Sequence, residues 1–306
     1  MKKEINLKVK IAGVEFKNPV IAASGTFGFG REYSEFYKLS VLGGISTKGT
    51  TFHPREGNSG VRIAETDGGI LNSVGLQNPG IDKFIAEEFP FLKKQGAVII
   101  VNIAGSTEED YCAAVEKLQN TAADMIELNI SCPNVKAGGM VFGVLPQSVY
   151  DITKAVKRYC KQPLMVKLSP NVADIAVNAQ AAESAGADAI SLINTLGGMA
   201  VDCRTRRPVL GNVTGGLSGK AVKPVALKMV WQVYNAVRIP IIGMGGIYSA
   251  SDALEFMICG AAAVQVGTAN LTDPYACRDI AEGLPALMRE LGIKDINEIV
   301  GTLNVN

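Results

Sequence analysis

Eight short apolar segments recur along the sequence, and amphipathic, helix-like segments separate them. They span residues 20–24, 42–48, 97–105, 125–131, 164–169, 189–195, 239–246 and 262–268. Strands that are apolar along most of their length are typical of a parallel sheet covered by helices, and eight such units predict a closed (β/α)8 TIM barrel, an α/β fold. A doubly wound open sheet is the alternative, but no G-x-G-x-x-G follows an early strand.

Three segments lie outside the repeating pattern. Residues 7–19 alternate polar and apolar side chains and turn at Ala12-Gly13, which predicts a β-hairpin ahead of the barrel. Segments 49–96 and 196–219 are rich in Gly, Asn and Thr and are expected as long insertions at the C-terminal face of the barrel. We see no linker, so residues 1–306 are expected to form a single barrel domain.

Side chains that commonly begin helices precede several of the helical segments. Ser106 with Glu109 has the spacing of a capping box, Asn171 precedes the segment after the fifth strand, and Ser249 with Asp252 precedes the segment after the seventh. We therefore expect helices to begin at these three places.

Composition excludes several classes of protein. Lys and Arg number 30 and Asp and Glu 29, so the chain has none of the basic excess of a nucleic-acid binder. The first residues alternate in polarity and contain no apolar run, which argues against a signal peptide or an N-terminal membrane helix and predicts a soluble, cytoplasmic protein. The six cysteines include no C-x-x-C pair, so no metal or iron–sulfur site is expected in this chain.

Polar residues or glycines follow nearly every expected strand, at the end where barrel enzymes place their active sites. They are Ser24, Lys48, Asn102, Asn129 with Cys132, Lys167, Asn194 with Thr195, Gly245 with Gly246, and Gly267 with Thr268. Together they predict one large polar site. The glycines after the last two strands favour a phosphate-binding site between those strands, although they could instead only form tight turns.

Three of these side chains have two interpretations each. Lys167 interrupts an apolar strand, either as a fixed cation beside a cofactor ring or as an outward lysine whose head reaches solvent. Lys48 could bind a substrate carboxylate or be a solvated loop residue. The amide of Asn129 would suit a ring with alternating N–H and C=O groups, because a carboxamide both donates and accepts hydrogen bonds, or the residue could only form a turn.

Cys132 lies just past the fourth strand in "ELNISCPN", between two asparagines. Its thiol could act as a general base, or as a nucleophile paired with the single histidine, His53. A small buried side chain is the remaining interpretation, and it is the one we expect for the other five cysteines.

Several motifs then resemble one family in order and spacing. They are "ASGTFGFGREY", "KGTTFHPREGN", "LNSVGLQNPG", "NISCPN", "VKLSPN", "NTLGGM", "GGLSG", "IIGMGGI" and "VQVGTA", and they extend over essentially the whole chain. They resemble the dihydroorotate dehydrogenases. The resemblance implies an FMN-containing barrel that oxidises dihydroorotate to orotate in pyrimidine (UMP) synthesis.

The resemblance also implies roles for individual positions. Cys132 matches the base that removes the substrate C5 proton while a hydride passes from C6 to flavin N5. Substrate-binding positions are Lys48, Asn72, Ser73, Val74, Gly75, Leu76, Asn129, Asn134, Asn194 and Thr195. Flavin-binding positions are Ser24, Lys48, Gly49, Asn102, Asn129, Lys167, Ile193, Gly219, Gly245, Gly246, Gly267 and Thr268.

The subclass that the sequence most resembles is the NAD-linked one (class 1, type B), through "TFGFGREY", "KGTTFHPREGN" and "DCRTRRPVLGNVTGGLSG". That resemblance implies a partner subunit carrying FAD and a 2Fe-2S cluster, in a heterotetramer of two chains of each kind. A fumarate-linked dihydroorotate dehydrogenase and a dihydropyrimidine dehydrogenase-like barrel acting on uracil or thymine are the enzyme alternatives. A barrel that binds a phosphate ligand without catalysis is a third. Ser59-Gly60 and Lys220 stand where prolines are usual, outside the proposed chemistry.

Overall fold

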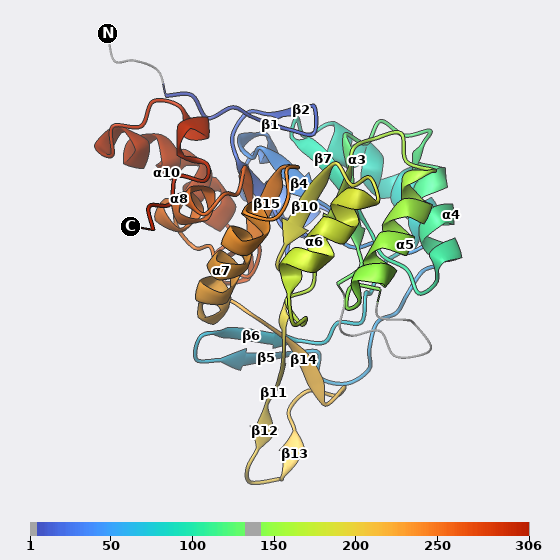
Figure 1. Ribbon diagram of the computed structural model, residues 1–306. Helices are drawn as coiled ribbons and strands as arrows, with labels where there is room; N and C mark the ends of the chain where they lie inside the picture. Colours follow the sequence, from blue (N-terminus) through green and yellow to red (C-terminus); the bar gives the residue numbers. More distant parts are fainter. Residues whose placement is uncertain (1–4, 132–141, 306) are drawn as a thin grey trace.

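A computed structural model describes residues 5–131 and 142–305, and in it the eight predicted strands form a closed parallel barrel (Figure 1). The barrel strands, in their order around the barrel, are β3 (Val20–Ala22), β4 (Gly44–Ser46), β7 (Val98–Ile103), β8 (Met125–Asn129), β9 (Leu164–Lys167), β10 (Ala189–Leu192), β15 (Ile241–Met244) and β16 (Ala263–Val266). The predicted barrel is confirmed. Each strand is shorter than its apolar segment, although Asn102, Asn129 and Lys167 still lie within their strands.

The barrel interior is filled by layers of side chains from alternate strands, as the tilt of a (β/α)8 barrel requires. Counted from β3, the odd strands supply an apolar layer of Ile21, Ile100, Met165 and Ile242, all buried. The even strands supply the next layer toward the C-terminal face, and every member of that layer is polar and fully buried: Ser46, Glu127, Ser191 and Gln265. The change from apolar to polar filling marks where the core ends and the site begins.

Helices surround the barrel (Figure 1). The longer ones are α4 (Glu108–Leu118), α5 (Pro146–Lys157), α6 (Ile175–Ser184), α7 (Lys223–Tyr234), α8 (Ala250–Ile258) and α10 (Ala276–Glu290). Shorter ones are α1 (Arg31–Ser34), η1 (Leu39–Val41), α2 (Ile81–Lys83), η2 (Phe84–Glu88), α3 (Phe89–Lys93), η3 (Lys220–Val222), α9 (Ala269–Thr272) and η4 (Ile296–Ile299). The expectation that all of 49–96 interrupts the alternation is wrong for 81–93, since this run is the helix that links the second and third barrel strands.

Two of the three predicted helix starts are displaced. The N-cap of α4 is Thr107, whose hydroxyl accepts from the Asp110 N–H at 3.2 Å, and the N-cap of α6 is Asp174. Asn171 is engaged elsewhere, because its side chain accepts from Gly197 N–H at 2.8 Å. The start of α8 at Ser249 is confirmed.

The two ends of the barrel carry different additions (Figure 1). The hairpin of β1 (Val9–Ile11) and β2 (Val14–Phe16), as predicted, lies at one end. At the C-terminal face, β5 (Ile63–Thr66), β6 (Gly69–Asn72), β11 (Leu196–Met199) and β14 (Thr214–Ser218) form one antiparallel sheet. Between β11 and β14 in the sequence, β12 (Val201–Asp202) and β13 (Arg207–Pro208) form a separate two-stranded sheet. Both predicted insertions therefore lie at the expected face, and β6 pairs directly with β14.

Within the described residues, no helix is both long and apolar enough to cross a membrane. Of the five cysteines described there, Cys277 is buried and Cys112, Cys160 and Cys259 are half-buried, whereas Cys203 is exposed in the turn between β12 and β13. The prediction of a small buried side chain is thus wrong for Cys203, because a two-residue strand at the tip of a protruding hairpin has no core to pack against.

Candidate functional site

A cavity of about 240 Å³ opens at the C-terminal face of the barrel, between the strand ends and the antiparallel sheet. Most residues predicted from the sequence line it: Ser24, Lys48, Gly49, Asn72, Val74, Gly75, Leu76, Asn129, Lys167, Ile193, Asn194, Thr195, Gly219, Gly245, Gly246, Gly267 and Thr268. The single predicted polar site therefore has a physical counterpart, and the ligands assigned to it remain predictions.

The layering of the barrel explains why these side chains converge. Lys48, Asn129, Ile193 and Gly267 each lie two residues beyond a member of the polar layer, and alternation along a strand returns them to the same inward face. Lys167 and Met244, from odd strands, lie between those two levels and also line the cavity. Lys167 is 5% exposed, which fits the cofactor-facing interpretation rather than a lysine that reaches solvent.

Two predicted residues lie behind the cavity wall. Asn102 is fully buried, donates to the Glu127 carboxylate at 2.6 Å and accepts from the Asn129 amide at 3.3 Å. Ser73 is also fully buried and accepts from the Asn58 amide at 3.0 Å. Neither side chain is among those that line the cavity. Cys132 and Asn134 lie outside the described residues.

Ser131, the last described residue before Cys132, is held by two asparagines of the site. Its hydroxyl donates to the Asn129 side-chain oxygen at 3.0 Å and accepts from the Asn194 amide at 2.8 Å. Ser131 is 3% exposed. The chain immediately before the cysteine is therefore fixed to the end of β8 and to the segment after β10.

The turn after β15 lines the cavity with two glycines, so that backbone atoms reach it without side chains. Gly245 has φ +121° and Gly246 φ +77°, a region that side chains disfavour. A Cβ at position 246 would lie 2.6 Å from the Lys223 Cβ and 3.0 Å from the Gly219 carbonyl oxygen. Any larger residue would have to displace the start of α7 or its neighbour, so the close approach requires glycine.

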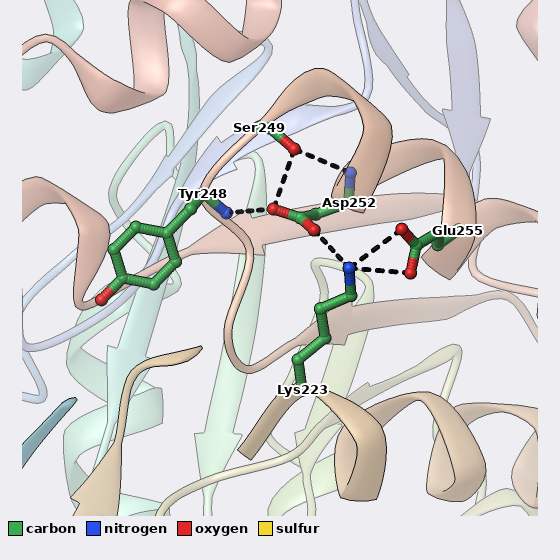
Figure 2. Close-up of polar contacts among 5 residues, drawn as sticks. All are labelled: Lys223, Tyr248, Ser249, Asp252 and Glu255. Carbon is green, nitrogen blue, oxygen red and sulfur yellow. Dashed lines mark hydrogen bonds and ion pairs between the residues drawn. The ribbon is translucent and has the colours of Figure 1, made fainter. Parts of the chain in front are cut away.

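An ion-pair network holds this turn against two helices (Figure 2). The Asp252 carboxylate accepts from the Tyr248 N–H at 2.8 Å and from the Ser249 hydroxyl at 2.9 Å, and the Lys223 ammonium binds both Asp252 and Glu255. Burial alone would raise the pKa of Asp252, but the hydrogen bonds from Lys223, Tyr248 and Ser249 together lower it. Lys223, from the first turn of α7, thereby fixes the position of the 245–248 turn.

Sequence reasoning missed Glu127. It is fully buried at the barrel centre and accepts hydrogen bonds from Ser46 at 2.6 Å, Asn102 at 2.6 Å, Ser191 at 2.7 Å and Gln265 at 2.9 Å. Burial alone would raise the pKa of this carboxyl, but Lys167 and the hydrogen bonds lower it. The available signal was a glutamate inside an apolar strand, two residues before Asn129 and hence on the same face.

Part of the cavity wall is apolar and was also missed. The contributing side chains include Ile63 and Ile70 from β5 and β6, Leu217 from β14, and Val222, Ile247, Tyr248 and Leu271 near the glycine turns. No local pattern identifies them, because which insertion residues face the barrel depends on how the antiparallel sheet pairs.

Known proteins similar to this chain agree with one another. A profile of the family described as "Dihydroorotate dehydrogenase" matches residues 6–288. A protein of Alkaliphilus metalliredigens (strain QYMF), named "Dihydroorotate dehydrogenase B (NAD(+)), catalytic subunit", is 59% identical over 300 residues, which cover 98% of this chain and 99% of that protein. A protein of Petrotoga mobilis (strain DSM 10674 / SJ95) with the same name is 54% identical over 299 residues, 98% of this chain and 100% of that protein.

Proposed function

Because the chain belongs to the dihydroorotate dehydrogenase family, we propose that it is an FMN-dependent catalytic subunit that oxidises dihydroorotate to orotate in pyrimidine synthesis, with NAD⁺ as the final acceptor. The observation that carries this proposal is identity of 53–59% along nearly the full length of relatives that share one name. The site geometry described above supplies independent support.

The cavity suits a flavin mononucleotide. The bare backbone around Gly245, Gly246 and Gly267, with Thr268, would hold the phosphate, and Lys167 at the floor would face the pyrimidine end of the flavin ring. The further proposed contacts are Ser24, Lys48, Gly49, Asn102, Asn129, Ile193 and Gly219. Asn102 would act indirectly, through its hydrogen bond with Asn129. When bound, FMN supplies the hydride acceptor.

The remaining polar groups of the cavity suit a small planar acid. We assign Lys48 to the substrate carboxylate, because it is the second lysine of the cavity wall. The side chains of Asn72, Asn129, Asn194 and Thr195 can meet the alternating N–H and C=O groups of the dihydropyrimidine ring. The 72–76 stretch and Asn134 complete the proposed substrate contacts.

Cys132 is the proposed base for the C5 proton. A free thiol has a pKa of about 8.5, close enough to neutrality for general-base catalysis with modest tuning. Its support is the preceding residue, Ser131, which Asn129 and Asn194 fix at the cavity. The proton would leave toward the sulfur while the hydride leaves toward the flavin.

Electrons are proposed to reach NAD⁺ through a partner subunit. The chain has no G-x-G-x-x-G fingerprint after an early strand and no C-x-x-C pair. We therefore propose FAD and a 2Fe-2S cluster in the partner, in an assembly of two catalytic and two electron-transfer chains.

The test is anaerobic reduction of the FMN-loaded protein. Addition of dihydroorotate should bleach the yellow flavin absorbance, whereas dihydrouracil should not, because it lacks the carboxylate assigned to Lys48. Rapid bleaching by dihydrouracil alone would favour a dihydropyrimidine dehydrogenase activity. A protein that binds no FMN under any condition would contradict the proposal altogether.

A further inference from the structure

The buried carboxylate of Glu127 has no part in the function proposed so far. It lies in the polar layer of the barrel, directly below the level that carries Lys167. Its three layer neighbours, Ser46, Ser191 and Gln265, all donate to it, and Asn102 donates from the level above. Residues from four other strands thus converge on one carboxylate.

The donor set indicates an ionised group. A carboxylate accepts at about four lone-pair positions, and four donors are present here. Two of them are the amide NH2 groups of Asn102 and Gln265, which donate hydrogen bonds but cannot accept one from a protonated carboxyl. A buried charge of this kind is tolerated only where a counter-charge and hydrogen bonds compensate it. Lys167, itself buried on the neighbouring strand and one level above, is the nearby positive charge: it lowers the pKa of Glu127 without a direct ion pair between the two side chains.

The same carboxylate sets the direction of a chain of hydrogen bonds that ends in the cavity. Because Glu127 only accepts, the Asn102 NH2 must face it, which turns the Asn102 oxygen toward the Asn129 NH2. The Asn129 oxygen then accepts from the Ser131 hydroxyl, which in turn accepts from Asn194. Two proposed substrate-binding amides therefore take their orientation from the barrel centre.

We propose that Glu127 is a positioning residue for flavin reduction: its carboxylate balances the Lys167 charge at the cavity floor and, through Asn102, orients the Asn129 amide. The flavin part of this inference rests on the proposed function, whereas the Glu127–Lys167 pair does not. The charge at the cavity floor is thus set by a side chain that touches neither substrate nor cofactor.

Glu127→Gln separates charge from hydrogen bonding. The buried Gln265 side-chain oxygen has no hydrogen-bond partner among the described residues, so the Gln265 amide can turn over and accept from a new NH2 at position 127. The Ser191 hydroxyl can rotate to accept as well, while the other oxygen of residue 127 still accepts from Ser46 and Asn102. The variant should fold and keep the Asn129 orientation. Ser191→Ala is the matched control, since it removes one buried hydrogen bond and leaves the charge.

The first measurement is the reduction potential of bound FMN. Loss of the negative charge below Lys167 makes the floor more positive and favours the anionic reduced flavin, so Glu127→Gln should raise the ratio of reduced to oxidised flavin at a fixed ambient potential at least about tenfold, or about 30 mV for two electrons. The KM for dihydroorotate should stay within about threefold, and Ser191→Ala should leave the potential at the wild-type value. An unchanged potential in Glu127→Gln, or an equal shift in Ser191→Ala, would overturn the proposal.

The second measurement needs no cofactor. A double-mutant cycle of Glu127→Gln and Lys167→Met, followed by urea unfolding of the FMN-free protein, measures the coupling of the pair. The unfolding constant of the double variant should be at least about tenfold closer to wild type than the product of the single effects predicts. Additive effects would refute the pairing. If no variant and no wild-type sample bound FMN, the proposed function would fail while this cycle still judged the pair.

Discussion

Gly246→Ala should damage both stability and cofactor binding, and its cost can be divided into two physical parts. The first is backbone strain, because φ is +77° at this position. The second is steric, because the new Cβ would lie 2.6 Å from the Lys223 Cβ and 2.9 Å from the Lys223 backbone nitrogen. Lys223 is in the first turn of α7 and is tied to Asp252 and Glu255, so it cannot move aside freely (Figure 2).

Gly292→Ala provides the matched control. Its φ of +73° is nearly the same, but a Cβ there would meet nothing within 4 Å. Strain alone should cost about 1–2 kcal/mol at either position. The steric part, comparable to overpacking a core, should add about 1–3 kcal/mol at Gly246 only. We therefore expect the free energy of unfolding to fall by about 1–2 kcal/mol in Gly292→Ala and by about 2–5 kcal/mol in Gly246→Ala, summing these two terms.

Urea unfolding of the FMN-free variants measures the free energy of unfolding, and a fluorescence titration measures the FMN dissociation constant. Relief of the contact must shift the 245–248 turn away from its position against α7, so Gly246→Ala should weaken FMN binding at least about tenfold, which is 1.4 kcal/mol. Gly292→Ala, at the end of α10, should bind FMN normally. Equal stability loss in the two variants, or unaltered FMN binding in Gly246→Ala, would refute the steric reasoning.

Further substitutions test the rest of the site. Cys132→Ala should retain FMN but lose most of its bleaching by dihydroorotate, because no base remains for the C5 proton; bleaching at the wild-type rate in a stopped-flow experiment would contradict that role. Lys48→Met should raise the KM for dihydroorotate at least about tenfold through loss of the carboxylate contact, and steady-state assays at saturating acceptor would detect it. Asp252→Asn should destabilise the protein by about 1–3 kcal/mol at pH 7 through loss of charged hydrogen bonds. Glu255→Gln, which changes the more exposed of the two carboxylates that bind Lys223, should cost less than about 1 kcal/mol. Since the folded-state pKa of Asp252 is lowered, its stabilisation is present above the ordinary pKa of about 4 and is lost as the pH falls through the folded-state value, so thermal unfolding of wild type and Asp252→Asn should converge in acid. The isolated chain should reduce NAD⁺ poorly, and efficient NADH formation without a partner would argue against the proposed electron-transfer subunit.

Local sequence pattern predicted the site where one strand was enough to decide it. Lys48 and Gly267 lie just beyond apolar strands and Asn129 ends one, and alternation along each strand places them on the inward face whatever the neighbouring strands are. The start of α8 was predictable for the same reason, since Ser249 and Asp252 bond within one turn. Helix starts were displaced where several polar residues compete, as between Ser106 and Thr107.

The sequence by itself determined the barrel and the ring of polar strand ends, because the strand period and the residues that start and stop helices are properties of neighbouring residues. Only the tertiary structure decided which residues meet across the barrel. Asn72 pairs with Gly216 in a sheet built from two distant insertions, and Glu127 accepts hydrogen bonds from strands as far along the chain as β16. Such contacts depend on the closure and stagger of all eight strands, which fix the height of every side chain in the barrel, and no short stretch of sequence contains that information.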